Sequence, residues 1–528
     1  MNRFIFFGGL SVILAIFGIF FFILAEILPL FGGARVEEAK AIQTDVAEPL
    51  LLGSDEWTEL PFVADSSGTL TFIDVSGERD PQVSGAPVPE GVSISSAVYL
   101  QGDQRVAYGL SSGEYLLGSI SYTPRFANDG TRTITASVEW DSPQALSDAK
   151  GLVSDIDLFI SDTRKTIAGI IETDRGPMVE VISLKQKKTL FGASGFSLDN
   201  KTNLSPSIDG VPVQVLVGAN AESIVVRTDD QSVTVFKWLD DNWERRQVFR
   251  PFEDAATRIA SMNLIQGQVS LSFTTTGGQH VIYSLYRSGE TGERLYGRTK
   301  TFAPFPNGAT EYARSMRNKA FLLANPGQLS LRYSTTAEVR WETELEKPLT
   351  ALLIGGKFDR ILGVDTQGII HVYSLDDPHP EAGFRAFFGK IWYEGQDEPQ
   401  FLWQSTGGTD DFEPKLSLIP LIVGSFKGTF YAMFFAIPIA LLAAIYTSQF
   451  LNPGLKRIIK PSIEIMASLP SVVLGFLGAL WLAPLIEDRV PSVILILSAI
   501  PLTAVLIGFL WNMFPLKIRI LIPKGWEF

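Results

Sequence analysis

Four long stretches of the chain are apolar and carry no charge. They cover residues 4–25, 428–448, 465–486 and 490–516. An α-helix rises about 1.5 Å per residue, so about 20 apolar residues cross the hydrocarbon core of a membrane. The pattern therefore predicts four membrane-spanning helices, with one long polar segment between the first and the second.

The first stretch is longer than the apolar core of about 7 to 15 residues in a secretory signal, and it continues through Glu26 and Pro29. It predicts an uncleaved anchor, although the small residues 32–34 leave a processing site open. Basic residues set the orientation, because short cytoplasmic segments are enriched in lysine and arginine. The residues that we place on the cytoplasmic side are Arg3, Lys456, Arg457, Lys460, Lys517, Arg519 and Lys524.

The polar segment shows period-two runs of β-forming residues separated by Gly, Asp, Asn and Ser. A similar unit, two apolar strands around a polar turn, recurs about seven times. The copies begin near Leu60, Ser95, Lys165, Pro212, Met262, Lys319 and Leu349. This spacing predicts an all-β, seven-bladed β-propeller-like domain, with a pair of β-sandwiches as the alternative. Its role is either a binding or sensing platform or a scaffold above the membrane.

Charge and composition exclude several classes of function. The chain has 44 basic and 57 acidic residues, and this net charge of −13 argues against nucleic-acid binding. Because cysteine is absent, disulfides and thiolate metal sites are excluded. The three histidines, His280, His371 and His379, are too few to suggest a metal site. The sequence predicts no catalytic residue, no metal and no cofactor held by this chain.

The C-terminal part carries a family resemblance. It contains Gly424–Thr429 with Pro438, then AAIYTSQF from Ala443, then KPSIEIMASLPSVVLGF from Lys460. These motifs resemble the permease subunits of phosphate-type (Pst) bacterial ABC importers, of the subtype with a long insertion after the first helix. The resemblance covers residues 416–528 well and the first helix more loosely. Sulfate and molybdate permeases share the general pattern and stay open as alternatives.

The resemblance implies a helical permease bundle in the bacterial inner membrane, with the large domain in the periplasm. It implies transport of inorganic phosphate, driven by ATP that separate cytoplasmic ATP-binding subunits hydrolyse. The other implied partners are a second permease subunit, a periplasmic phosphate-binding protein and membrane lipid. On this interpretation the chain is not an enzyme; a membrane-anchored propeller enzyme or a sensor is the alternative.

The predicted domains are an anchor helix (1–31), a periplasmic domain (32–400), a linker (401–415) and a permease region (416–528). Permeases of the resembled class carry a cytoplasmic coupling loop with a Glu-Ala-Ala-type sequence and further helices after it. No such segment follows residue 516 in this sequence. We therefore expect the permease region to be incomplete, either by truncation or because the rest is encoded separately.

Two sets of residues are candidates for function within the permease region. Small side chains recur every four residues and predict a close helix contact, either within the chain or with another subunit. This packing set is Gly424, Gly428, Ala432, Ala436 and Pro438. Polar or helix-breaking residues near the third helix predict a pathway or gate. An i, i+4 ion pair with Lys460 at the membrane interface is the alternative for Glu464, and hydrogen bonds from the hydroxyls to the helix backbone are the commoner role of such serines. This pathway set is Glu464, Ser468, Pro470 and Ser471.

Overall fold

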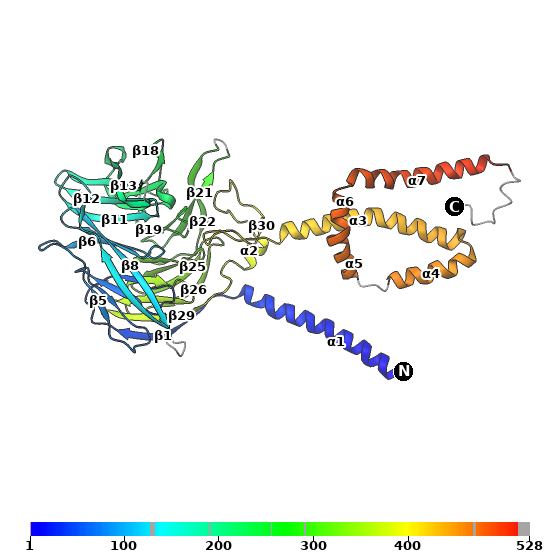
Figure 1. The fold of residues 1–528 in the computed structure, drawn as a ribbon, viewed down its shortest axis with the longest axis horizontal. Coiled ribbons are helices and arrows are strands. Elements are labelled where there is room, and N and C mark those ends of the chain that lie inside the picture. Colours follow the sequence, from blue (N-terminus) through cyan, green and yellow to red (C-terminus); the bar gives the residue numbers. More distant parts are fainter. Residues whose placement is uncertain are drawn as a thin grey trace. The chain divides into compact units, whose positions relative to one another are not determined.

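The structure is a computed structural model that describes residues 2–126, 132–189, 192–254, 256–289, 292–467 and 471–515. It divides into two compact units, Met1–Leu421 and Ile422–Phe528. The first unit holds helix α1 (Asn2–Ile27) and a large β domain. The second holds the remaining long helices, drawn in orange and red in Figure 1.

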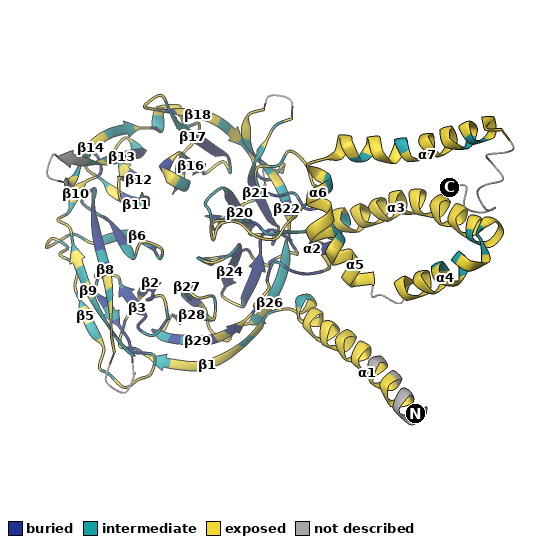
Figure 2. Cartoon of the chain, turned by 45° about the vertical axis from the view of Figure 1, so that its right-hand side comes forward, coloured by how far each residue is buried: buried dark blue, intermediate teal, exposed yellow. Residues whose placement is uncertain are grey.

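Within the described residues, seven antiparallel sheets of four or five strands are arranged in a ring, each built almost entirely from consecutive strands (Figure 2). An eighth sheet has only two short strands, β30 (Trp403–Gln404) and β31 (Lys415–Leu416), in the segment that leads to α3. The ring is a seven-bladed β-propeller, and it confirms the predicted fold class. Radial repetition of small sheets leaves only short edges exposed, so the fold limits unwanted strand pairing. Each of the seven predicted repeat units falls in a different blade.

The blades are numbered here in chain order. Blade one contains β2 (Pro49–Gly53), β3 (Phe62–Asp65), β4 (Leu70–Phe72) and β5 (Gln82–Ser84). Blade two contains β6 (Ile94–Leu100), β7 (Arg105–Leu110), β8 (Glu114–Phe126), β9 (Arg132–Trp140) and β10 (Gln144–Ala145). Blade three contains β11 (Leu152–Ile160), β12 (Arg164–Thr173), β13 (Gly176–Thr189) and β14 (Gly192–Asn203).

In each of the remaining four blades, the strands are named from the centre of the ring outwards. Blade four contains β15 (Pro212–Val217), β16 (Ser223–Thr228), β17 (Val233–Leu239) and β18 (Asn242–Phe249). Blade five contains β19 (Ile259–Leu264), β20 (Ser270–Thr275), β21 (His280–Arg287) and β22 (Arg294–Thr301). Blade six contains β23 (Glu311–Arg314), β24 (Ala320–Asn325), β25 (Gln328–Tyr333) and β26 (Glu338–Glu344). Blade seven contains β27 (Leu349–Ile354), β28 (Arg360–Asp365), β29 (Ile369–Asp376) and β1 (Arg35–Gln43).

Local sequence explains the hairpins within the blades. In blade one, Asp65 accepts the backbone N–H of Ser67, and Gly68 takes a φ of +85° that only glycine adopts at little cost. Blade seven repeats this turn, with Asp365 as the acceptor and Gly368 at a φ of +75°. The same Asp-x-x-Gly turn thus joins the second and third strands of two blades that are far apart in sequence.

Apolar faces of neighbouring blades form the core. Phe62 and Phe72 of blade one pack in one cluster with Tyr108 and Leu116 of blade two, and all four are buried. Burial of such a side chain stabilises the fold by about 1.5 to 3 kcal/mol. Contacts of this kind recur between blades six and seven. The alternating strands therefore bury both faces of each blade against its two neighbours.

The ring is closed by the strand that follows the first helix. Strand β1 pairs antiparallel with β29, from Arg35 opposite Asp376 to Gln43 opposite Ile369. The last blade is therefore built from the first and the final strands of the domain. This pairing joins residues more than three hundred positions apart in sequence, and it holds the two ends of the propeller together.

The chain enters and leaves the propeller at neighbouring points. Phe31, at the end of the 3-10 turn η1 (Leu28–Phe31), packs edge-on against Phe387 of the short helix α2 (Phe384–Phe388), with ring centres 5.5 Å apart. The backbone N–H of Leu418 donates to the carbonyl oxygen of Phe387 at 2.8 Å. Helix α3 begins at the next residue. The segment that follows α1 and the segment that precedes α3 therefore both contact α2.

The second unit is helical. It contains α3 (Ile419–Ile445) with the π-helical turn η4 (Tyr446–Phe450), α4 (Pro453–Ala467), α5 (Ser471–Leu477) with the π-helical turn η5 (Gly478–Leu482), α6 (Ala483–Glu487) and α7 (Val490–Met513). Among the described residues, Phe6–Phe31, Ile419–Phe450 and Val490–Met513 are long and apolar enough to cross a membrane. A fourth span requires the pair Pro453–Ala467 and Ser471–Glu487, which is bent by 87°. The span predicted over residues 465–486, in which Pro470 was expected to interrupt the helix, corresponds to the second part of this bent pair.

Candidate functional site

The packing set lies along helix α3. Gly424, Gly428, Ala432, Ala436 and Pro438 are all within its bounds, with Pro438 in the helix interior. A Cβ atom added to Gly424 or Gly428 would meet no atom within 4 Å among the described residues. This face of α3 has room for a second helix at close distance. Its partner stays a prediction.

The pathway set is only partly covered by the structure. Glu464 is an exposed residue of α4, and Ser471 is the first residue of α5. Ser468 and Pro470 lie outside the described residues. The break between α4 and α5 falls in the motif that contains all four. Among the described residues no hydrogen bond joins Glu464 to Ser471, and their role in a pathway stays a prediction.

Two π-helical turns add features that the sequence analysis missed. In η4, Thr447 donates to the carbonyl oxygen of Ala443 at 2.7 Å, and Ser448 donates to that of Ile445 at 3.1 Å. Hydroxyl groups of this kind satisfy backbone carbonyls where a helix widens. The turn η5 lies in the second helix of the bent pair. Such turns occur often at functional positions of helices.

The histidines have structural roles. His280 is 1% exposed, with Ser272 Oγ 2.9 Å from Nε2 and Arg332 Nη1 2.8 Å from Nδ1. His371 lies beside Glu38, 2.8 Å from Nδ1 to Oε1. In the part of the chain that the structure describes, no group of three metal-ligating side chains is found. Hydrogen bonds within the propeller therefore account for His280 and His371.

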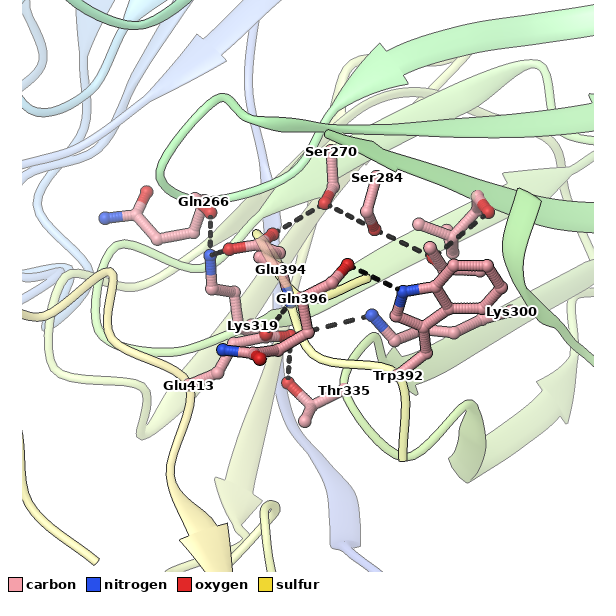
Figure 3. Close-up of polar contacts among 12 residues, drawn as sticks. Gln266, Ser270, Ser284, Lys300, Lys319, Thr335, Trp392, Glu394, Gln396 and Glu413 are labelled. Atoms are coloured by element: carbon pink, nitrogen blue, oxygen red, sulfur yellow. Dashed lines mark hydrogen bonds and ion pairs between the residues drawn. The ribbon is translucent and has the colours of Figure 1, made fainter. Parts of the chain in front are cut away.

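A buried cluster of charges fastens the segment before α3 to the propeller (Figure 3). Lys319 Nζ lies 2.7 Å from Glu394 Oε2, and Lys300 Nζ lies 3.6 Å from Glu413 Oε1. The side chains of the two lysines are 1% and 3% exposed. The lysines belong to blades five and six, whereas the two glutamates belong to residues 389–418, which lead to α3. We call these four residues the linker anchor.

Hydrogen bonds complete the linker anchor. Glu394 accepts from Ser270 Oγ at 2.6 Å, and Glu413 accepts from Thr335 Oγ1 at 2.8 Å and from the backbone N–H of Glu394 at 2.7 Å. Burial, together with repulsion from Glu413, raises the pKa of Glu394. Burial opposes ionisation of Glu413 too, but the two lysines and the hydrogen bonds outweigh it and lower the pKa of Glu413. The anchor is therefore a paired and hydrogen-bonded buried network.

A void of about 600 Å³ lies among the innermost strands of the seven blades. Its lining includes the ionisable side chains of Asp155, Asp157, Arg227, Glu311 and Arg314. We call this void the central channel. Sequence reasoning missed it, because its five ionisable side chains come from three blades and no local motif joins them.

Burial dominates the acid chemistry of the central channel. It raises the pKa of Asp155 to about 7, that of Asp157 to about 6 and that of Glu311 to about 8. Asp155 and Asp157 also accept the backbone N–H groups of Val215 and Val217, each at 2.7 Å. These two bonds join blade three to blade four. Among the described residues, Glu311 makes no such hydrogen bond to a neighbouring blade.

Comparison with known proteins gives partial matches. No family model matches the chain. It is 33% identical over 89 residues to the probable ABC transporter permease protein YqgH of Bacillus subtilis (strain 168), which is 17% of this chain and 29% of that protein. It is 31% identical over 99 residues to the phosphate transport system permease protein PstC of Pasteurella multocida (strain Pm70), 18% of this chain and 29% of that protein. The chain thus spans less than a third of the length of either relative.

Solved structures resemble this chain only distantly. The Chaetomium thermophilum Raptor structure has a TM-score of 0.45 at 13% identity, over 66% of this chain and 29% of that one. The Cps50 (Swd1) β-propeller domain of Myceliophteria thermophila has a TM-score of 0.42 at 10% identity, over 65% of this chain and all of that one. The fold and the two permease matches define a chain with apolar helices, a permease-like region and a seven-bladed β-propeller.

Proposed function

We propose that this chain is a permease subunit of an ABC importer of the Pst type, which moves inorganic phosphate across the bacterial inner membrane. The observation that carries the proposal is the similarity to two permeases, one of which is named as part of a phosphate transport system. The run KPSIEIMASLPSVVLGF from Lys460, which resembles phosphate-type permeases, supports the same substrate.

In this proposal the chain performs no chemistry itself. ATP is hydrolysed by separate cytoplasmic subunits, a second permease subunit completes the pathway, and a periplasmic protein delivers phosphate. The small-residue face of α3 is the contact surface for a further helix, because an approach at Gly424 and Gly428 meets no side chain there. The 87° bend between α4 and α5 lies beside the pathway in this proposal, since a span is interrupted within a membrane only where protein or a water-filled cavity surrounds it.

The orientation follows from the basic residues. Arg3, Lys456, Arg457 and Lys460 are placed on the cytoplasmic side by the positive-inside rule, so the propeller lies in the periplasm. The acidic pair Glu487 and Asp488, just before α7, then lies outside, as that rule allows.

Uptake of radiolabelled phosphate tests the proposal. We expect a strain that lacks this gene to lose high-affinity phosphate uptake and to regain it when the gene is returned. Sulfate and molybdate uptake, measured in the same strains, serve as the specificity control. Unchanged phosphate uptake in the deletion strain would remove the proposal, and loss of sulfate or molybdate uptake alone would reassign the substrate.

A further inference from the structure

The central channel gathers charge from opposite sides of the propeller ring. Asp155 and Asp157 come from β11 in blade three, Arg227 from β16 in blade four, and Glu311 and Arg314 from β23 in blade six. Burial raises the pKa of Asp155 and Asp157, and the nearby charges of Arg227 and Arg314 partly oppose that rise at Asp155 and Asp157 respectively. The charged groups therefore converge on one space.

The two arginines are not neutralised by a contacting carboxylate. Neither Arg227 nor Arg314 forms an ion pair within 4.0 Å among the described residues. Arg227 Nε donates to Gln214 Oε1 at 3.3 Å. Both terminal nitrogens of Arg314 lie 3.1 Å from the side-chain oxygen of Gln268 when that amide is oriented to accept. A guanidinium stays charged and has five N–H donors, so each arginine keeps donors for a further acceptor.

Glu311 adds hydrogen-bonding capacity on the same wall. Its carboxyl has no hydrogen bond or ion pair to any described residue, and burial alone accounts for its raised pKa of about 8. At neutral pH this carboxyl is mostly protonated and can donate to an oxygen or accept from a hydroxyl. Asp155 and Asp157 differ, because their backbone bonds to blade four already explain them.

We propose that the central channel binds a phosphate group, free or as a small monoester, with Arg227 and Arg314 donating to its oxygens and Glu311 hydrogen-bonding its hydroxyl. Arginine pairs with phosphate oxygens through charged, often bidentate hydrogen bonds. A void of about 600 Å³ is within the range of small-molecule sites and exceeds the volume of one anion, which leaves room for an ester substituent. The choice of phosphate over other oxyanions rests on the proposed function.

Equilibrium dialysis of the full chain in detergent, without other subunits or ATP, tests the proposal. The probes are inorganic phosphate, glycerol 3-phosphate as a monoester and sulfate as an oxyanion without a hydroxyl. We expect saturable binding of about one phosphate compound per chain, and weaker binding of sulfate. The tighter of the two phosphate probes identifies whether the ligand is free phosphate or an ester.

Three variants place the binding in the central channel. Arg227→Met and Arg314→Met each remove a charged donor and should weaken phosphate binding about 10-fold or more. Glu311→Gln should weaken phosphate binding but not sulfate binding, and it should leave the unfolding temperature unchanged or higher, because an unpaired buried carboxyl is lost. The matched control is Arg317→Met, since Arg317 is a surface arginine paired with Glu56 and Asp410.

The outcomes separate this site from the transport function. The proposal fails if neither phosphate probe binds saturably, or if both channel arginine variants, folded by circular dichroism, bind as the parent does. A loss in Arg317→Met equal to that in Arg314→Met would overturn it too. Normal phosphate uptake by a chain that binds no phosphate in the central channel would remove the site and leave the transport function. Phosphate binding in the central channel by a chain that supports no phosphate uptake would remove the transport function and leave the site.

Discussion

The contact between His280 and Arg332 makes the stability of the propeller depend on pH through one residue. His280 begins β21 in blade five, and Arg332 lies on β25 in blade six, with Nη1 2.8 Å from Nδ1 of the histidine. The ring of Phe302 stacks on the imidazole at 4.4 Å. Because the arginine nitrogen can only donate, Nδ1 must accept, and the imidazole is neutral. Burial and the charge of Arg332 hold the pKa of His280 well below its usual range.

This assignment predicts a loss of stability in acid. An exposed histidine titrates near about 6.5, so the unfolded chain binds one more proton than the folded chain below that pH. The free energy of unfolding then falls with pH below about 6.5, by up to about 1.4 kcal/mol per pH unit for this group. We expect His280→Gln to reduce that slope, measured by denaturant unfolding of the β signal between about pH 7 and about pH 5.

The exposed His379 provides the control for this slope. His379 lies 3.4 Å from Glu381 and its side chain is 52% exposed. His379→Gln should leave the acid slope close to that of the parent. Equal slopes for His280→Gln and the parent would show that His280 is not held neutral in the folded chain.

Some local interactions could be predicted from the sequence, and others could not. The Gly and Asp residues of the polar turns marked the hairpins, because their conformational preferences act over four residues. The linker anchor gave no such signal. Lys319 and Glu394 are 75 residues apart, and each on its own looks like an ordinary surface charge. Only the packing of residues 389–418 on blades five and six brings the two together.

At the scale of elements, the linker anchor attaches the segment before α3 to the propeller. Lys319 Nζ donates to the carbonyl oxygen of Gln266 and to Glu394, each at 2.7 Å. Lys300 Nζ is buried with no hydrogen-bond partner among the described residues, and its 3.6 Å contact with Glu413 is an ion pair only. The two lysines therefore offer a matched comparison within one cluster.

We predict unequal effects of removing the two lysines. Lys319→Met leaves Glu394 buried without its cation and should cost about 3 to 5 kcal/mol of unfolding free energy. Lys300→Met should cost less, because it also removes a buried ammonium group whose donors are unused. Thermal unfolding of the full chain in detergent measures both. A cost for Lys300→Met equal to or above that for Lys319→Met would contradict this account of the anchor.

The prediction of elements from the sequence succeeded where a repeat or a long apolar run existed. Seven β-rich runs gave seven blades, since each run carries its own alternation and its own turn. Strand β1 was not predicted, because the sequence RVEEAKAIQ is mostly exposed and lacks a clear alternation. Its place is decided by pairing with β29, which is distant in sequence. The sequence marked the region after α4 as interrupted through Pro470, but the size of the bend, 87°, could not be predicted because the apolar pattern continues on both sides of it.

At the scale of the whole molecule, the propeller is a domain whose two ends meet. Strand β1 closes the ring at one end, and residues 389–418 return to blades five and six at the other. Phe31 and Phe387 then bring the exits toward α1 and α3 together. A domain with adjacent ends can be inserted between two helices without forcing them apart.

The last prediction is that the propeller folds without the membrane helices, provided that both ends are kept. Residues 32–418 retain β1, the blades and all four members of the linker anchor, so this fragment should be soluble with a β-dominated circular dichroism spectrum. Residues 45–395 lack β1 and Glu413, and should unfold roughly 5 °C or more below the longer fragment. Residues 32–395 keep β1 but lose Glu413, and should lie between the two. Equal unfolding temperatures for all three fragments would show that neither the closing strand nor the anchor stabilises the ring, and a mainly helical spectrum would contradict the fold itself.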